Sequence, residues 1–373
     1  MRKSLVIASL LITAMVTSVK VEGFDMGQSL MEIGKDAAQG YLSPAVTVFG
    51  TGMNAGWYNS SKSLTMFKLP IGISVFSMSE AFANIDEDMQ TFTFNGKLPT
   101  APIMDPVVAN ANLPGISTWQ QLVDANPSLP KEIPFSADGV PTVFGSDEPR
   151  KLTVAELFAA DPAAATLLFT TIGLPNDTVS LPFVGMDYTG LSPSLPAVTA
   201  FTIGVKAIPV IDNMQLGVRW FPEMKLGDVG KIGQFGFKIQ HEFTRFVPVV
   251  KDLPFLHTSA YWAMNSLNID AGSASLEQSN WVIMANASAD AKFFIGLGAF
   301  IGLGFESSSM TLDVDMTEAG LDNYSLTIDG DNGFRFQTGL RLSLLNFDIY
   351  ADANFGAVTS YNTGITLIGL NGL

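Results

Sequence analysis

The chain contains no cysteine, only two histidines, and far fewer basic than acidic side chains. Without cysteine, neither a disulfide framework nor a thiolate metal site can form. The 20 Lys and Arg against 35 Asp and Glu leave a formal net charge of −15. Because phosphate binding needs clustered basic side chains, this balance argues against nucleic acid as a partner.

Motifs that carry chemistry are also scarce. His241 begins "HEFTR", which lacks the second histidine of a zinc-binding HExxH because position 245 is Arg. His257 is the other histidine, and nothing selects a serine to pair with it. The acidic stretches 84–88 and 329–333 complete no calcium loop. We therefore expect no catalytic residue, no metal, no cofactor and no enzymatic activity.

Long apolar runs are confined to the amino terminus. Arg2 and Lys3 precede an apolar run over 5–19, which is too short to span a bilayer as a helix. With small residues following, this layout indicates a secretory signal peptide over 1–23; a membrane anchor is the alternative. Without residues 1–23 the formal charge is −17, yet the mean hydropathy of the whole chain is +0.29. We expect apolar surface to face something other than water.

Strict alternation of apolar and polar residues is what the chain has in abundance. In 233–248, "GQFGFKIQHEFTRFVP", every second residue from Phe235 to Phe243 is apolar or His241. Segments 290–306, 335–344 and 346–356 repeat the pattern. A period of two indicates strands. Lengths of roughly 9 to 15 residues suit tilted strands crossing a membrane, whereas strands of a soluble β-sandwich average about 5–6.

The expected fold is therefore all-β: a transmembrane antiparallel β-barrel of about 10–14 strands over 63–373. A large soluble β-sandwich is the alternative. Connections alternate between short and long along the chain, as in bacterial outer-membrane barrels. We expect the protein in the outer membrane of a Gram-negative cell, in contact with membrane lipid and inserted by the barrel-insertion machinery.

Residues 95–198 interrupt the alternation and contain 14 of the 20 prolines. Two stretches, 117–126 and 153–169, have helical character, and Thr153 with Glu156 forms a capping-box signature. Counting strand directions places this insertion outside the membrane on the cell surface, although it could instead fold into the lumen as a plug. It is either a binding lid or a surface decoration.

A resemblance to known barrels begins at 24–62, which opens with a helix-like piece and becomes Gly-rich around Trp57 and Tyr58. This segment resembles the hatch of FadL/TodX-type outer-membrane transporters, and "GVRWFP" (217–222) is similar to an uncharacterised barrel family found alongside them. The first resemblance implies passive uptake of hydrophobic molecules. The chain departs from it in lacking an evident Asn-Pro-Ala hatch motif and in ending "LNGL" instead of on an aromatic residue.

If the Phe- and Leu-rich faces meet lipid, the opposite faces line the lumen. The expected lumen residues are Lys206, Arg219, Lys238, Glu242, Asp290, Phe294, Phe300, Arg335, Arg341, Asp348 and Asp352. A two-residue hairpin tip at 344–345 would set Arg341 across from Asp348, and a four-residue loop would set it opposite Asn346. Inward glycines at 296, 298, 302 and 304 suggest a partly hydrophobic passage, or close packing against a plug.

Two functions follow from these expectations. The first is a passive channel or binding protein for a small hydrophobic substrate. The alternative is a structural or surface-interaction barrel that displays 95–198 without transport. A continuous apolar and aromatic lumen would favour transport, whereas a lumen filled by ion-paired side chains would favour the structural function.

Overall fold

The computed structural model describes residues 35–61, 72–83, 87–181, 183, 185, 195–206, 213–225, 230–271, 274–292, 295–315, 323–344 and 347–368. The described residues of Ala45–Ile85 and Pro193–Leu373 form one compact unit, the barrel unit. Those of Ser18–Pro44 and Asp86–Ser192 form a second, the insertion unit. The expected signal peptide, 1–23, lies outside the described residues.

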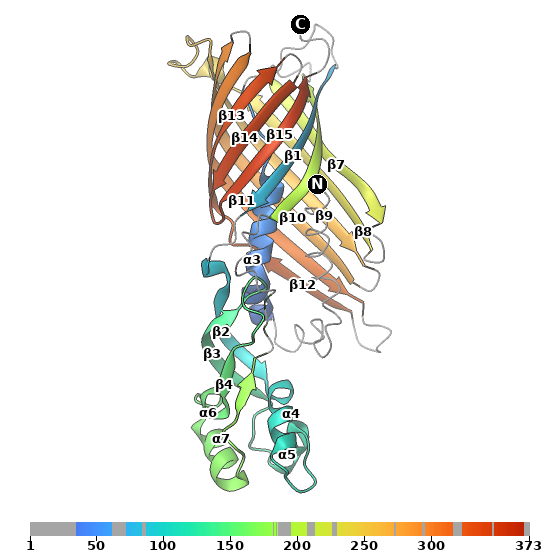
Figure 1. The fold of residues 1–373 in the computed structure, drawn as a ribbon, viewed down its shortest axis with the longest axis vertical. Helices are drawn as coiled ribbons and strands as arrows, with labels where there is room; N and C mark the ends of the chain where they lie inside the picture. The colour runs from blue at the N-terminus through green and yellow to red at the C-terminus, as the bar shows by residue number, and fades with distance from the viewer. Residues whose placement is uncertain are drawn as a thin grey trace. The chain divides into compact units, whose positions relative to one another are not determined.

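The barrel unit is a closed ring of antiparallel strands (Figure 1). The strands are β1 (Gly72–Ala83), β6 (Leu195–Lys206), β7 (Met214–Lys225), β8 (Lys231–Glu242), β9 (Leu256–Asp270), β10 (Ala274–Lys292), β11 (Gly296–Val314), β12 (Tyr324–Asp329), β13 (Phe334–Leu344), β14 (Phe347–Phe355) and β15 (Ser360–Ile368). Neighbours in the ring run β10-β9-β8-β7-β6-β1-β15-β14-β13-β11, and β10 pairs with β11 to close it. In the described part of the chain the ring therefore has ten strands, with β12 as an additional partner of β11.

Large apolar side chains cover the outside of this ring. Leu340 is 68% exposed, and Trp220 and Phe305 are each 57% exposed. A soluble protein rarely exposes so continuous an apolar surface, whereas a hydrocarbon layer accommodates it. The predicted all-β transmembrane antiparallel barrel is confirmed. None of the described helices has both the length and the apolar character needed to cross a membrane.

The two ends of the barrel differ in their connections. At one end, which we call the terminal end, β1 begins and β15 ends, and the connections are 207–213, 243–255, 293–295 and 345–346. At the other, the loop end, lie 84–194, 226–230, 271–273, 315–323 and 356–359. The two shortest turns of the terminal end join β10 to β11 and β13 to β14.

The sequence patterns did not show how far the strands extend at the loop end. From the sequence, 306–333 was either an external connection or a source of further strands. The second expectation is correct, because β11 continues to Val314 and pairs with β12. The outward-facing residues of these extensions are Ser, Thr and Asp, so they lack the apolar face that identifies a lipid-facing strand. Inside, Met310 and Leu326 are buried.

Neither expected register of the β13–β14 hairpin is correct. Leu344 pairs with Phe347, so the two-residue tip is 345–346 and Arg341 stands opposite Tyr350. Shifting the tip by one residue moves every cross-strand partner by two, which keeps the same side chains facing inward. Arg341 still reaches Asp348 diagonally, with its Nη1 3.8 Å from the Asp348 Oδ2.

The insertion unit has a core of its own. Its elements are η2 (Glu87–Met89), β2 (Thr91–Pro99), α4 (Thr100–Asn110), α5 (Trp119–Ala125), β3 (Glu132–Pro141), β4 (Lys151–Thr153), α6 (Val154–Leu157), α7 (Pro162–Thr166), η3 (Leu167–Ile172) and β5 (Thr178–Ser180). Strands β2 and β3 pair, as do β4 and β5. Trp119 packs against Phe158, and Phe94 against Phe135. The unit begins before the predicted start of the insertion at 95.

Both predicted helical stretches are helical, and the Thr153–Glu156 capping box is confirmed. Residues 153–169 are divided into two helices because Asp161 caps a new helix and Pro162 occupies its first position. Residues 35–44, the first half of helix α3 (Lys35–Asn54), also belong to this unit. There Tyr41 packs against Phe183.

Candidate functional site: the occupied lumen

The lumen of the barrel unit is occupied by residues 45–61, which we call the lumen plug. It consists of the second half of α3 and the non-helical stretch that follows, and its side chains are buried or half-buried throughout. At the loop end, Gln278 and Ser308 donate hydrogen bonds to the Val46 carbonyl. At the terminal end, the Ser61 amide donates to Ser288. The plug therefore spans the lumen.

Two buried cations hold the carboxyl end of α3. Arg219 on β7 donates from Nη1 to the Met53 carbonyl, at 2.7 Å, and from Nη2 to the Ala55 carbonyl, at 2.9 Å. Its guanidinium lies 4.0 Å from the centre of the Trp57 ring. Lys238 on β8 donates to the Trp57 carbonyl at 2.7 Å. The last carbonyls of a helix lack intrahelical partners and carry partial negative charge, so cations from the wall complement them.

An ion pair fastens the plug nearer the loop end. Arg335 on β13 pairs with Glu306 on β11, and both side chains are 1% exposed. Glu306 also accepts hydrogen bonds from Thr51 and Asn54 of the plug. A buried charge pair is tolerated where further hydrogen bonds satisfy its remaining atoms. Here Thr51 and Asn54 of the plug supply these hydrogen bonds.

The break between β12 and β13 adds a second contact at the loop end. Asn332 donates to the Thr47 carbonyl at 3.2 Å and to the Thr51 hydroxyl at 2.8 Å. The amide of Asp331 donates to the Thr47 hydroxyl. The "DGDNG" stretch, considered in the sequence only as a weak calcium candidate, thus binds the plug.

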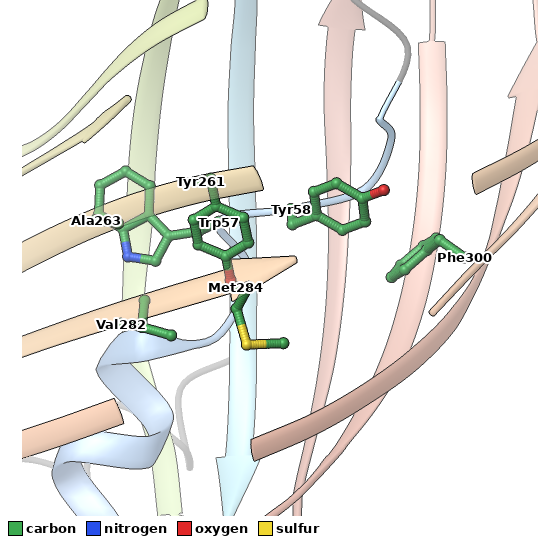
Figure 2. Packing of buried hydrophobic residues seen from close by; sticks show 7 residues of the cluster. All are labelled: Trp57, Tyr58, Tyr261, Ala263, Val282, Met284 and Phe300. Atoms are coloured by element: carbon green, nitrogen blue, oxygen red, sulfur yellow. The ribbon is translucent and has the colours of Figure 1, made fainter. Parts of the chain in front are cut away.

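An aromatic and aliphatic cluster surrounds the plug after the helix ends. It comprises Trp57, Tyr58, Tyr261, Ala263, Val282, Met284 and Phe300 (Figure 2). The Tyr58 ring stacks on Tyr261 at a centroid distance of 5.9 Å and meets Phe300 edge-on at 5.3 Å. These contacts close the middle of the lumen with apolar side chains.

The other inward acidic side chains find partners within the wall. Arg341 pairs with Asp290 on β10, as well as with Asp348. The carboxylate of Asp352 accepts hydrogen bonds from three neighbouring amides, those of Gln337, Asn354 and Asn362. Cations and carboxylates in the lumen are thus compensated locally, as buried charges require.

The inward glycines accommodate close packing, the second of the two expectations from the sequence. A Cβ added at Gly298 would lie 2.8 Å from Asp290 Oδ1, and one at Gly304 would lie 2.6 Å from the Met284 sulfur. On the plug, a Cβ at Gly50 would come within 2.3 Å of the Ser308 Cβ. Small residues here allow α3 to approach the wall closely.

Of the predicted lumen residues, the structure brings six into contact with the plug or with charged partners in the wall, and Asp352 binds three wall amides. The six are Arg219, Lys238, Asp290, Arg335, Arg341 and Asp348. Phe300 packs on the plug. Glu242 lies at the terminal end of β8, where its carboxylate is 3.0 Å from His257 Nδ1 and accepts from Thr244. Phe294 and the side chain of Lys206 lie outside the described residues.

The uncharged polar residues of the site were not identified from the sequence. Buried amide side chains contact the plug from the wall, among them Asn265, which donates to the Met53 carbonyl, and Gln240, which donates to the Ser60 carbonyl. Both sit at inward positions of alternating strands. That position was the available signal, but an amide without a known partner does not indicate what it binds.

A hollow of about 1110 Å³ is lined by Phe255 and by short stretches of β10, β11, β13, β14 and β15. Leu297, Leu340 and Ile349 line it with largely exposed side chains, and Ala299 and Ala351 lie between them. Its lining is mostly apolar. The exposed members belong to the surface that faces hydrocarbon.

Comparison with solved structures gives only weak likenesses. Ail, the attachment invasion locus protein of Yersinia pestis, is 13% identical; the match covers 42% of this chain and 96% of Ail, with a TM-score of 0.26. OmpT, an outer membrane protein of Vibrio cholerae, is 6% identical over 80% of this chain and 97% of OmpT, with a TM-score of 0.21. The description of the fold rests on the strands themselves.

No curated protein matches the chain. A family model does, over residues 1–368, which is nearly the whole sequence. The uncharacterised family expected from the sequence is consistent with that match, whereas the resemblance to FadL/TodX-type transporters stays a hypothesis. The chain belongs to the family of unknown function DUF6588.

Proposed function

We propose that this protein is an outer-membrane barrel that is closed by its own lumen plug and displays the insertion unit at the cell surface. The observation that supports this is the filled lumen, in which wall side chains bind the plug from Val46 to Ser61. An open channel would leave those carbonyls and charges to water. The proposal is the structural or surface-interaction function expected as the alternative from the sequence.

The insertion unit suits a positively charged partner. Residues 86–192 carry four basic and 13 acidic side chains, a formal charge of −9. Like-charged surfaces would be repelled, and a basic partner would be attracted over about a Debye length, or roughly 8 Å at physiological ionic strength. The unit has its own core, so it can present a fixed surface to such a partner.

Uptake of a labelled long-chain fatty acid or aromatic hydrocarbon tests the closed lumen. Cells with and without the gene should take up the compound at the same rate. In parallel, an antibody raised against the insertion unit should bind intact cells that carry the gene. Gene-dependent uptake would contradict the closed barrel, and absence of antibody binding would contradict surface display.

Passage of a small hydrophobic molecule is the second candidate, because the middle of the lumen is apolar and aromatic. Tyr261, Phe300 and Met284 would line it if Trp57 and Tyr58 moved away. This function requires the plug to move, since the described lumen leaves its apolar side chains in contact with the plug. Gene-dependent uptake that also changes in a variant lacking 24–62 would favour it.

A further inference from the structure

We infer that the amino-terminal arm, residues 35–44, leads into a plug that is threaded through the barrel, so that this arm emerges at the loop end, on the cell surface. The inference rests on the proposed function for the sidedness of the insertion unit. It goes beyond that function because it assigns residues 35–44 to the exterior and makes them part of what the cell displays.

The direction of the plug is given by its contacts with the wall. Val46 and Thr47 contact Gln278, Ser308 and Asn332. In the ring, Gln278 and Ser308 are close to the β10 start and the β11 end, both of which lie at the loop end. The chain therefore enters the lumen from the loop end.

The other end of the plug lies at the opposite end of the barrel. Asn59 donates to Thr366, close to the end of β15, and Ser61 contacts Ser288 and Ser259. Only ten residues then separate Ser61 from Gly72, where β1 begins at the terminal end. The chain thus leaves the lumen on the side where the first strand starts.

The longest connection identifies which end faces the cell exterior. Transmembrane barrels have short periplasmic turns and longer external loops. The connection 84–194 lies at the loop end, whereas the connections of the terminal end span between 2 and 13 residues. The loop end is then external, and so are residues 35–44, which precede the plug.

The insertion unit supports the same arrangement independently. Residues 35–44 of α3 belong to its core, where the Val143 amide donates to the Tyr41 carbonyl and a Cβ at Gly40 would lie 2.3 Å from the Phe92 ring. The unit that the cell displays is thus assembled from two parts of the chain, the threaded arm and the 86–192 insertion. It is complete only when the arm has passed through the barrel.

The absence of cysteine makes single-cysteine labelling a direct test. Gln39→Cys reports on the arm, Asp124→Cys on the insertion unit, and Asp252→Cys on the connection 243–255 at the terminal end. Intact cells are treated with a membrane-impermeant maleimide, and again after the outer membrane is permeabilised. Asp124 and Asp252 are exposed, so neither site hinders the reagent.

We expect Gln39→Cys and Asp124→Cys to react on intact cells and Asp252→Cys to react only after permeabilisation. If Gln39→Cys needs permeabilisation while Asp124→Cys does not, threading is overturned. If both need it, the arm is not on the cell surface and the surface display of the proposed function fails too. The labelling of Asp124→Cys by itself reports whether surface display has failed.

Two double-cysteine variants test the path through the lumen without relying on sidedness. Ser61→Cys with Ser259→Cys joins hydroxyl positions 3.0 Å apart at the terminal end. Thr51→Cys with Asn332→Cys joins two side chains near the loop end, whose Thr51 Oγ1 and Asn332 Nδ2 atoms are 2.8 Å apart. Threading predicts that both disulfides form on oxidation, whereas Ser61→Cys with Asp252→Cys gives none. Formation of only one of the two would contradict a plug that spans the lumen.

Discussion

At the residue scale, the lumen pairs side-chain cations with backbone carbonyls. Arg219 and Lys238 are buried, and the ion pairs found among the described residues do not include either of them. Their compensation comes from backbone carbonyls at the carboxyl end of α3 and just beyond it, and α3 has no basic residue of its own in its last turn. A helix end and the wall around it are therefore matched electrostatically.

Replacement of Lys238 by Met should loosen the plug. It leaves the Trp57 carbonyl without its donor, at a cost of about 1–3 kcal/mol, which corresponds to roughly a 5- to 150-fold change in an equilibrium. The measurement is the rate at which a maleimide modifies Ser60→Cys in this background. Lys225→Met, at an exposed position of β7, is the matched control and should leave the rate unchanged. Equal rates in the two variants would argue against the role of Lys238.

The capping box in the insertion unit should respond to acid. Hydrogen bonds from the Thr153 backbone and hydroxyl lower the pKa of Glu156. The contribution of the carboxylate is therefore present above its ordinary pKa, about 4.3, and is lost as pH falls through the lowered value. Hydrogen exchange of a peptide covering 151–158 should lose protection over that range, relative to Glu156→Gln. An identical pH dependence in both proteins would contradict this assignment.

Removal of the cap itself provides a second measure at the same position. Thr153→Ala should reduce the stability of the insertion unit by about 1 kcal/mol, because the first turn of α6 loses its acceptor. Thr166→Ala is the control, since that exposed hydroxyl only donates back to the Pro162 carbonyl. Hydrogen exchange of the 151–158 peptide distinguishes the two variants, since only Thr153→Ala should lose protection there. A similar loss of protection in both variants would contradict a capping role.

At the element scale, the approach of α3 to β11 depends on Gly50. Alanine there places a Cβ 2.3 Å from that of Ser308, and such overpacking costs about 1–3 kcal/mol. Gly50→Ala should lower the melting temperature of the barrel, and adding Ser308→Gly should recover part of the loss. Gly333→Ala, whose Cβ would meet nothing within 4 Å, serves as the control. If the melting temperature does not recover in the double variant, the contact between residues 50 and 308 is not the source of the strain.

The elements were predictable from the sequence to different extents. Alternation located the membrane strands and their inward residues, since lipid on one side imposes a period of two on every strand. It did not delimit β12 or the last third of β11, where the outward residues are Ser, Thr and Asp and no apolar face marks contact with lipid. The hairpin register failed because the two-residue tip at 345–346 carries no strong turn signal.

The plug was the least predictable part of the site. A hatch-like segment was expected by resemblance, but its bonds to the wall are made largely through backbone carbonyls, such as those of Val46, Met53 and Trp57. Every residue has a backbone carbonyl, so the sequence does not show which carbonyls accept hydrogen bonds from the wall. The inward cations were identified, whereas their partners required the path of the chain through the lumen.

At the scale of the whole molecule, the insertion unit should be dispensable for the barrel. Replacing 88–190 by a short Gly-Ser linker removes a unit with its own core, while the ring pairings of β1 with β6 and β15 remain. The shortened protein should still insert in the membrane and resist unfolding by detergent at room temperature, as seen by gel mobility. Loss of insertion would show that the unit is needed for assembly. Unaltered wild-type protein is the control.

A lumen closed by residues 45–61 is tested most directly by ionic conductance in a planar lipid bilayer. The full-length protein should show no steady open-channel current. A variant in which 24–61 is deleted should conduct, because the ring then encloses water and the charges of Arg219, Lys238 and Glu306. A steady current from the full-length protein, equal to that of the deletion variant, would contradict the closed barrel.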